Sequence, residues 1–270
     1  MMIQFLLVIG LLLSSYVESN LIFPKPNIFI LAGQSNMAGR GGVKKGVWDG
    51  NVPPECQPNP SILRLSANYI WEEAKEPLHK DIDVAKPAGI GPGMPFANSV
   101  LRKDPYIGFI GLVPCAIGGT QISEWERGTQ NYNRLIDRTR FAMRSGGFIR
   151  AILWYQGESD TNTDVDTISY KKKLEKFFLD VRADLLLPFL PIIQVAIISG
   201  INTKDIDIVR QAQLKTRLPN VRCVDPKGLP LKDDYLHLTT PSQVKLGQML
   251  AAAFLKFPNS VSEKWNNTKP

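Results

Sequence analysis

The chain has 270 residues, 44% of them hydrophobic, which is enough for one large domain or two small ones with an ordinary core. Its formal net charge is +7, but the positive residues are scattered and form no basic run with interleaved aromatics, which argues against a nucleic-acid partner. It has only two histidines, and no pair of its three cysteines has metal-ligand spacing, so we expect neither a metal nor any other cofactor.

The N-terminal segment is typical of a secretory signal. The apolar run Phe5–Leu13 is too short to span a bilayer comfortably, and small residues stand at the −3 and −1 positions before Asn20. We predict a signal peptide over residues 1–19 and a single secreted domain over residues 20–270, with no stable membrane association after cleavage. The alternative is an uncleaved N-terminal anchor.

Cleavage at this position has two consequences for the mature chain. It removes one acid, Glu18, and no base, so the formal charge moves from +7 to +8. A basic secreted protein suits residence near polyanions such as acidic cell-wall polysaccharide. Secretion also permits one disulfide with one thiol left over, and the pairing stays open among Cys56, Cys115 and Cys223.

Further along the chain, short apolar runs alternate with longer amphipathic stretches. The apolar runs predict strands at Asn27–Ala32, Ile107–Pro114, Ile149–Trp154, Leu190–Ala196 and Arg222–Val224. The amphipathic stretches predict helices at Pro95–Lys103, Tyr132–Arg144, Thr167–Leu186, Lys204–Leu218 and Pro241–Phe257. The first four strands are almost continuously hydrophobic, as expected of parallel strands covered on both faces. The alternation predicts an α/β fold with a mainly parallel open sheet.

The stretch 39–105 departs from this alternation. It is rich in proline and glycine, so we expect short irregular pieces lying over the sheet before the helix at its end. It offers no linker clear enough to divide the chain.

Polar motifs follow four of the predicted strands, where ligands bind in open α/β sheets. Ser35 follows the first strand, Gly118-Gly119 the second, Gln156 the third, and Asp234 and His237 come after the last. A serine after a strand is often only a helix N-cap. The spacing of Asp234 and His237, however, lets the carboxylate fix one ring nitrogen and leave the other for a serine, as in a Ser-His-Asp hydrolase.

Each of these motifs has an alternative reading. Asp233 is a second candidate for orienting the histidine, whereas His79 follows no predicted strand and suits a structural role. Gly118-Gly119 lacks the lysine of a P-loop, so a glycine N–H serving an oxyanion hole is favoured over phosphate binding. Gln156 either donates its amide to the same oxyanion or caps a loop.

Together these motifs resemble the SGNH hydrolases, and more closely the plant branch of the sialic-acid-specific acetylesterase-like domain in carbohydrate esterase family six. The resemblance rests on four blocks in order and spans about Asn27 to Phe257: Gly33-Gln34-Ser35-Asn36-Met37-Ala38-Gly39, Ile117-Gly118-Gly119-Thr120, Trp154-Tyr155-Gln156-Gly157-Glu158-Ser159-Asp160 and Asp234-Tyr235-Leu236-His237-Leu238-Thr239. It implies a three-layer α/β/α flavodoxin-like fold and hydrolysis of O-acetyl groups on carbohydrate.

The resemblance also implies a role for each site residue. The catalytic triad is Ser35, Asp234 and His237, and the oxyanion hole is Ser35, Gly118 or its neighbour, and Gln156, which stands where SGNH enzymes in general have asparagine. Substrate-binding candidates are Gln34, Asn36, Gly119 and Glu158, and no metal is implied. We therefore expect a secreted serine esterase acting on acetylated carbohydrate, with cell-wall polysaccharide such as xylan favoured. The alternatives are an esterase for another acyl group or a small molecule, and an inactive carbohydrate-binding relative.

Overall fold

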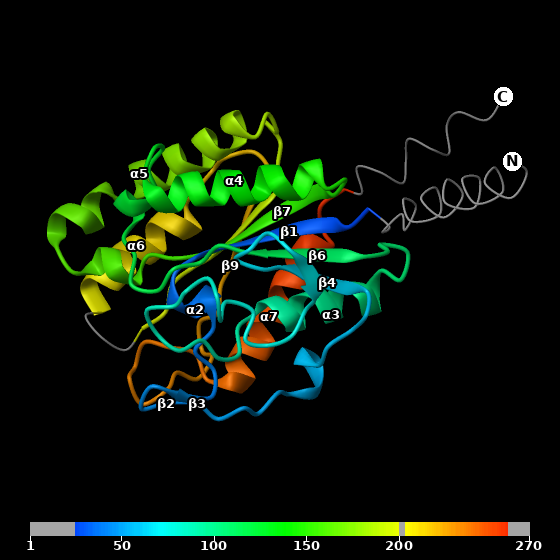
Figure 1. Ribbon diagram of the computed structural model, residues 1–270. Helices are drawn as coiled ribbons and strands as arrows, with labels where there is room; N and C mark the ends of the chain where they lie inside the picture. The colour runs from blue at the N-terminus through cyan, green and yellow to red at the C-terminus, as the bar shows by residue number, and fades with distance from the viewer. Residues whose placement is uncertain (1–24, 200–202, 259–270) are drawn as a thin grey trace, which may run out of the picture.

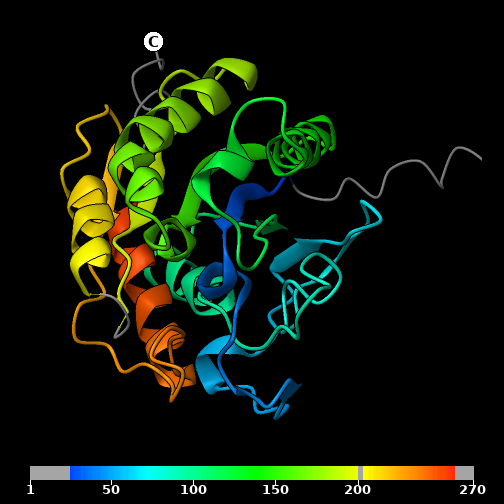
Figure 2. The ribbon, with the colours of Figure 1, turned by 90° about the vertical axis from the view of Figure 1, so that its left-hand side faces the viewer.

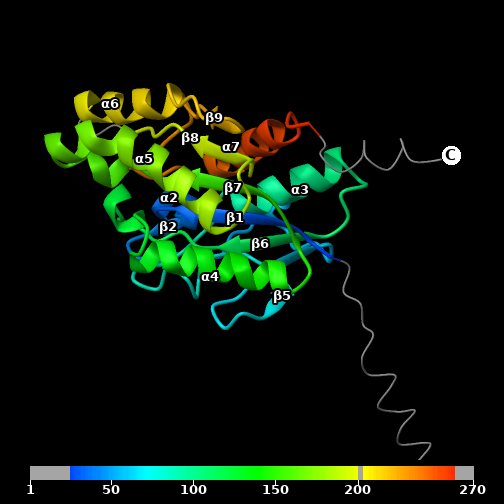
Figure 3. The same cartoon turned by 90° about the horizontal axis from the view of Figure 1, so that it is seen from above.

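The computed structural model describes residues 25–199 and 203–258, so the predicted signal peptide lies outside the described residues. Within these ranges a seven-stranded sheet has the order β5-β4-β6-β1-β7-β8-β9, and Figure 3 shows it crossing the molecule from β5 to β9. Neighbouring strands are parallel except β4 and β5. The strands are β1 (Asn27–Gly33), β4 (Ile62–Leu65), β5 (Trp71–Glu73), β6 (Ile110–Pro114), β7 (Phe148–Tyr155), β8 (Ile192–Val195) and β9 (Val221–Val224), and β2 (Val43–Lys44) and β3 (Val47–Trp48) form a separate hairpin.

Helices cover both faces of the sheet and give the predicted three-layer arrangement (Figure 1). Helices α3 (Gly93–Lys103) and α7 (Thr240–Phe254) pack together on one face, whereas α4 (Gln130–Arg144) and α5 (Asp164–Asp184) lie on the other. Helix α6 (Thr203–Leu214) packs beside α5. The short helical turns are α2 (Ser35–Ala38), η1 (Pro54–Cys56), η2 (Ile122–Trp125) and η3 (Glu158–Thr161).

Aromatic side chains join the layers on each face. On one face Phe29 of β1 meets Phe96 of α3 and Phe254 of α7, with ring centroids 4.9 and 4.8 Å apart. On the other, Trp154 of β7 lies 4.5 Å from Phe177 of α5. Since such rings bury large apolar areas and prefer offset or edge contacts, they fix how the helices sit on the sheet.

The stretch 39–105 is more regular than predicted, because it contributes β4 and β5 to the edge of the central sheet. Strand β4 was not predicted because it contains a charged residue, Arg64, that is only 1% exposed. Its guanidinium donates to the carbonyl oxygen of Leu78 at 2.7 Å and pairs with Glu72 and Asp81. A buried arginine is tolerated only when it is paired in this way, and such partners are not visible in the sequence.

Two further findings concern the cysteines and the lengths of the helices. Cys56, Cys115 and Cys223 are all free, so the disulfide that secretion would permit is not formed in the described structure. Among the described residues, no helix combines the length and the apolar character needed to cross a membrane.

Candidate active site

The turn after β1 places Ser35 at the carboxyl edge of the sheet. Gly33 has a φ of +126°, and a Cβ there would lie 2.1 Å from the carbonyl oxygen of Tyr155, so only glycine lets β1 approach β7 this closely. The N–H of Gln34 then donates to the same carbonyl at 2.8 Å. Helix α2 therefore begins at Ser35, and Figure 2 faces this edge, with the short blue helix near its centre.

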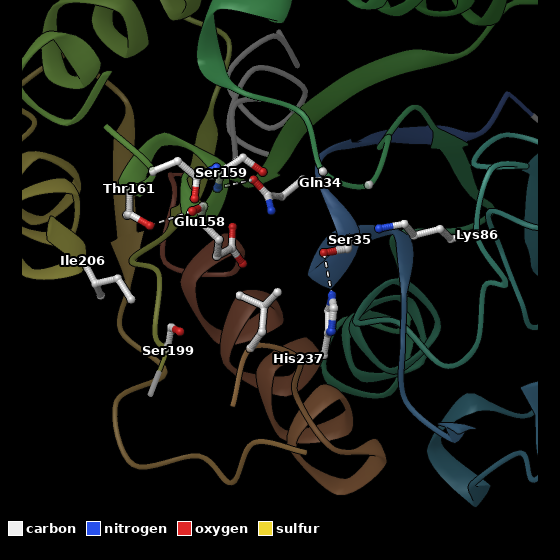
Figure 4. Close-up of a pocket in the computed structure, with 13 residues that line it drawn as sticks. Gln34, Ser35, Lys86, Glu158, Ser159, Thr161, Ser199, Ile206 and His237 are labelled. Carbon is white, nitrogen blue, oxygen red and sulfur yellow. Dashed lines mark hydrogen bonds between the residues drawn. The ribbon is translucent and has the colours of Figure 1, made fainter. Parts of the chain in front are cut away.

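Ser35, His237 and Asp234 form a continuous line of hydrogen bonds. The Nε2 atom of His237 lies 2.8 Å from Ser35 Oγ (Figure 4), and its Nδ1 atom lies 2.8 Å from Asp234 Oδ2. Ser35 is 5% exposed and lines a cavity. The structure therefore brings together the three residues of the predicted triad, and Asp234 rather than Asp233 contacts the ring.

The loop before α7 is shaped to present His237. Asp234 Oδ1 accepts the backbone N–H groups of Leu236 and His237 at 3.0 and 2.9 Å, which closes an Asx-type turn. Tyr235 takes a left-handed φ of +55° within this turn. The N–H of Lys232 donates to the carbonyl oxygen of His237 at 2.8 Å. Both oxygens of the aspartate are thus engaged, one with the backbone and the other with the ring.

The electrostatics of this group favour a neutral imidazole beside an ionised carboxylate. Burial lowers the pKa of His237 below its usual 6.5, the Asp234 carboxylate opposes this, and Arg40 and Lys232 lower it further. Partial burial raises the pKa of Asp234, but hydrogen bonds from the backbone and ring of His237 and from the N–H of Leu236 together outweigh that effect and hold this pKa below its usual range. A neutral histidine can accept a proton from the serine.

A cavity of about 470 Å³ opens directly on Ser35. Its walls come from the loops after β1, β6, β7 and β8, from the His237 loop, and from Lys86 and helix α6. The loops after β1, β6 and β7 and the His237 loop carry the motifs that were predicted to meet at this edge. Most of its lining side chains are polar (Figure 4). The lining residues are Gln34, Ser35, Lys86, Gly118, Gly119, Glu158, Ser159, Thr161, Asn162, Ser199, Ile206, Leu236 and His237.

Gly118 and Gly119 both line this cavity, but glycine is favoured at the first position by lack of space and at the second by its backbone conformation. A Cβ on Gly118 would lie 2.6 Å from Arg40 Nη2 and 3.0 Å from Asp83 Oδ2. Arg40 and Asp83 form a buried ion pair behind the glycine, which sequence inspection missed because 43 residues separate the two charges. Gly119 has open space around it but a φ of +80°.

The structure contradicts the predicted oxyanion role of Gln156. Its side chain is 0% exposed and does not line the cavity. Its amide hydrogens are shared among three protein acceptors, because Nε2 donates to the carbonyl oxygen of Thr120 at 2.9 Å, to Asp160 Oδ2 at 2.5 Å and more weakly to Gln34 Oε1 at 3.4 Å. Gln156 therefore has no donor left for a ligand.

Gln34 presents an amide to the cavity instead. Its Oε1 atom accepts from Gln156 Nε2 at 3.4 Å and from the N–H groups of Gly157 and Ser159 at 3.3 and 3.4 Å. With the oxygen end held by three donors, the amide nitrogen faces the cavity beside Ser35 (Figure 4). Reversing the amide would set donors against donors, so these contacts fix its orientation.

Two more substrate-binding candidates differ in where they lie. Asn36 is completely buried and does not line the cavity, so the structure contradicts its predicted contact with substrate. Glu158 does line it, and burial raises the pKa of this carboxyl to about 7, although a hydrogen bond from Asn36 opposes the shift. Its Oε2 atom is buried without a hydrogen-bond partner in the described structure.

The second histidine, His79, is buried away from the cavity. His79 is 1% exposed and does not line the cavity, and burial lowers its pKa to about 3. Nowhere in residues 25–199 and 203–258 do three His, Cys, Asp or Glu side chains cluster in a way that could hold a metal ion.

Known proteins share both the sequence and this architecture. A family model described as carbohydrate esterase, sialic acid-specific acetylesterase, matches residues 25–256. The chain is 58% identical over 239 residues to a probable carbohydrate esterase of Arabidopsis thaliana, over 86% of this chain and 91% of that protein. An Arabidopsis thaliana protein of known structure matches with a TM-score of 0.83 and 57% identity, over 86% of this chain and 98% of that one. A carbohydrate acetylesterase from Xanthomonas citri shares the fold at 20% identity and a TM-score of 0.61, over 84% of this chain and 55% of that one.

Proposed function

The chain belongs to the carbohydrate esterase family described as sialic acid-specific acetylesterases, and from this premise we propose that it removes O-acetyl groups from carbohydrate through a Ser-His-Asp acyl-enzyme mechanism. Membership makes it a carboxylic ester hydrolase. The observation that carries the mechanism is the line of two 2.8 Å contacts from Asp234 through His237 to Ser35, which ends at the cavity.

The reaction has two steps in this proposal. His237 Nε2 takes the proton of Ser35 as Oγ attacks the ester carbonyl, and the same proton passes to the leaving sugar hydroxyl as the acetyl-enzyme forms. A water then gives a proton to His237, attacks the acetyl carbon and releases acetate, and Ser35 recovers its proton. Asp234 holds the imidazole in the required tautomer and stabilises its charged form.

Three donors are assigned to the oxyanion. Two are the backbone N–H groups of Ser35 and Gly118, whose Cβ positions would lie 3.5 Å apart. The third is Gln34 Nε2, supported by its open orientation into the cavity, and it replaces Gln156 in this role. Donors fixed before the reaction stabilise the developing charge without reorganisation, which is the largest single contribution in many acyl-transfer enzymes.

The substrate is assigned from the cavity and the N-terminal sequence. A volume of about 470 Å³, lined mostly by residues with polar side chains that can hydrogen-bond sugar hydroxyls, suits a hydroxylated acetyl sugar better than a long apolar acyl chain. The apolar run Phe5–Leu13 supports secretion, and the formal charge of +7 supports residence near acidic cell-wall polysaccharide, which makes acetylated xylan the favoured substrate. Another acyl ester, or ligand binding without turnover, is the alternative.

Acetate release from a panel of substrates tests this function. The panel contains acetylated xylan, acetylated pectin, O-acetylated sialic acid, and p-nitrophenyl acetate and octanoate, each with wild type and Ser35→Ala. We expect wild type to release acetate from acetylated polysaccharide, to prefer the acetate over the octanoate ester, and to lose turnover in S35A. Preference for octanoate would contradict the carbohydrate assignment, and binding of xylan without acetate release would make the chain a binding protein.

A further inference from the structure

Asn36, the residue after the proposed nucleophile, contacts the backbone on both sides of His237. Its Nδ2 atom donates to the carbonyl oxygen of Leu236 at 3.1 Å, and its Oδ1 atom accepts the N–H of Leu238 at 3.0 Å. The side chain is 0% exposed, so water does not compete for these hydrogen bonds. One amide therefore ties the His237 loop to helix α2, which also carries Ser35.

Glu158 determines which way round the Asn36 amide lies. Its Oε1 atom accepts a second hydrogen bond from Asn36 Nδ2, at 2.8 Å. Reversing the amide would turn Oδ1 toward two acceptors, the Glu158 carboxylate and the Leu236 carbonyl, and would turn Nδ2 toward the N–H of Leu238. Because every partner would then be mismatched, the orientation that holds the loop is strongly favoured.

The backbone of Asn36 is held from a third direction. Its carbonyl oxygen accepts from Gln243 Nε2 of helix α7 at 3.0 Å, and the Gln243 side chain is 0% exposed. Helix α2 is therefore fixed against the strand-end loop of Glu158, the His237 loop and helix α7 at once. A small movement of any one would change the distance between Ser35 Oγ and His237 Nε2.

We propose that Asn36 is a positioning residue that keeps the His237 imidazole within reach of Ser35, and that Glu158 orients the Asn36 amide for this purpose. The inference rests on the proposed function, which makes His237 the base. The line from Asp234 fixes how the ring is turned, but Asp234 and Tyr235 are exposed and belong to the same loop. In addition to the Ser35–His237 contact itself, the Asn36 hydrogen bonds join that loop to the segment carrying the nucleophile. A misplacement of about 1 Å can reduce the rate of an enzyme about 100-fold.

Reversing the donor and the acceptor tests this proposal. Asn36→Asp puts an oxygen in place of Nδ2, facing Glu158 and the Leu236 carbonyl, and we expect kcat for p-nitrophenyl acetate to fall about tenfold or more. KM should change far less, because Asn36 does not line the cavity. In the double substitution N36D/E158Q, the glutamine supplies a donor opposite the new carboxylate. N36D should therefore lower kcat by a smaller factor in the E158Q background than in the wild-type background.

A matched control is available at the other end of β1. Asn27 also donates its amide to a backbone carbonyl, that of Ile107 at 2.5 Å, but it lies far from the His237 loop. Asn27→Asp is the same chemical change, and it should leave kcat unchanged even if it lowers the temperature of unfolding. Circular dichroism checks that each variant folds. Should N36D not fold, Asn36→Ala, which loses both loop contacts without adding charge, takes its place with the same expected fall in kcat.

Three results would overturn the proposal. The first is an unchanged kcat in a folded Asn36 variant, and the second is a raised KM with unchanged kcat, which would make Asn36 a substrate-binding residue. The third is an equal fall in kcat in N27D, which would make the effect a general loss of structure. Failure of the proposed function is separate, because it would appear as continued turnover in Ser35→Ala whatever the Asn36 variants do.

Discussion

Replacement of Gln34 by alanine tests how the oxyanion of the proposed reaction is stabilised. Three long hydrogen bonds of 3.3–3.4 Å hold Gln34 Oε1 away from the cavity and leave its Nε2 free to donate. Removal of one oxyanion donor costs about 3–4 kcal/mol of transition-state stabilisation, which corresponds to a loss of about 100- to 1,000-fold in kcat. KM should change little, because the contact strengthens as charge develops on the oxygen.

Gln156→Ala is the matched comparison. This change removes one of the three donors to Gln34 Oε1 and leaves the N–H groups of Gly157 and Ser159 in place, so we expect a smaller loss of about fivefold. Both variants are measured for kcat and KM on p-nitrophenyl acetate, with thermal unfolding to confirm the fold. A larger loss in Gln156→Ala than in Gln34→Ala, or a Gln34→Ala variant altered only in KM, would refute the assignment of the oxyanion donor.

Three further predictions concern the histidines and Gly118. His237→Ala should lose most of kcat, whereas His79→Gln should lose little. Since burial lowers the pKa of His237, kcat/KM should stay constant down to pH 6.5 and fall only at lower pH, and a midpoint above 6.5 would contradict this. The pKa of His79 is about 3 in the folded protein, so the free energy of unfolding is highest above pH 6.5 and falls by about 2 kcal/mol at pH 5 as the unfolded state takes up a proton. Urea unfolding of His79→Gln should show a smaller fall between these pH values, and an unchanged pH dependence would contradict this. Gly118→Ala, which meets Arg40 and Asp83, should lower kcat more than Gly119→Ala, and the reverse order would make Gly119 the donor.

Much of the fold was predictable because its signals are local. The apolar run of β1, from Ile28 to Ala32, is 0% exposed throughout, and the predicted helix that starts near Pro95 is α3. Strands β4 and β5, on one side of the sheet, were not predicted, because a charged residue, Arg64, occupies a buried position in β4. Its partners Glu72, Leu78 and Asp81 become neighbours only after folding.

The same holds for the site: the positions of its motifs could be predicted from the sequence, whereas contacts between distant segments could not. Placing motifs at strand ends correctly predicted that Ser35, Gly118, Glu158 and His237 would meet around one cavity, and the family named from these motifs is confirmed. Side-chain direction could not be predicted, because Gln156 is drawn inward by Thr120 and Asp160. The roles of Gln34 and Asn36 likewise depend on hydrogen bonds between segments far apart in the sequence.

The most direct test of the account is to identify the residue that forms the covalent intermediate. Incubation with a serine-directed phosphonate, followed by peptide mass spectrometry, should show one label, on Ser35, with no label and no acetate release from acetylated xylan in Ser35→Ala. His237→Ala should be labelled far more slowly than wild type, because the hydroxyl has lost its base. A label on any other residue, or acetate release that persists in Ser35→Ala, would contradict the account.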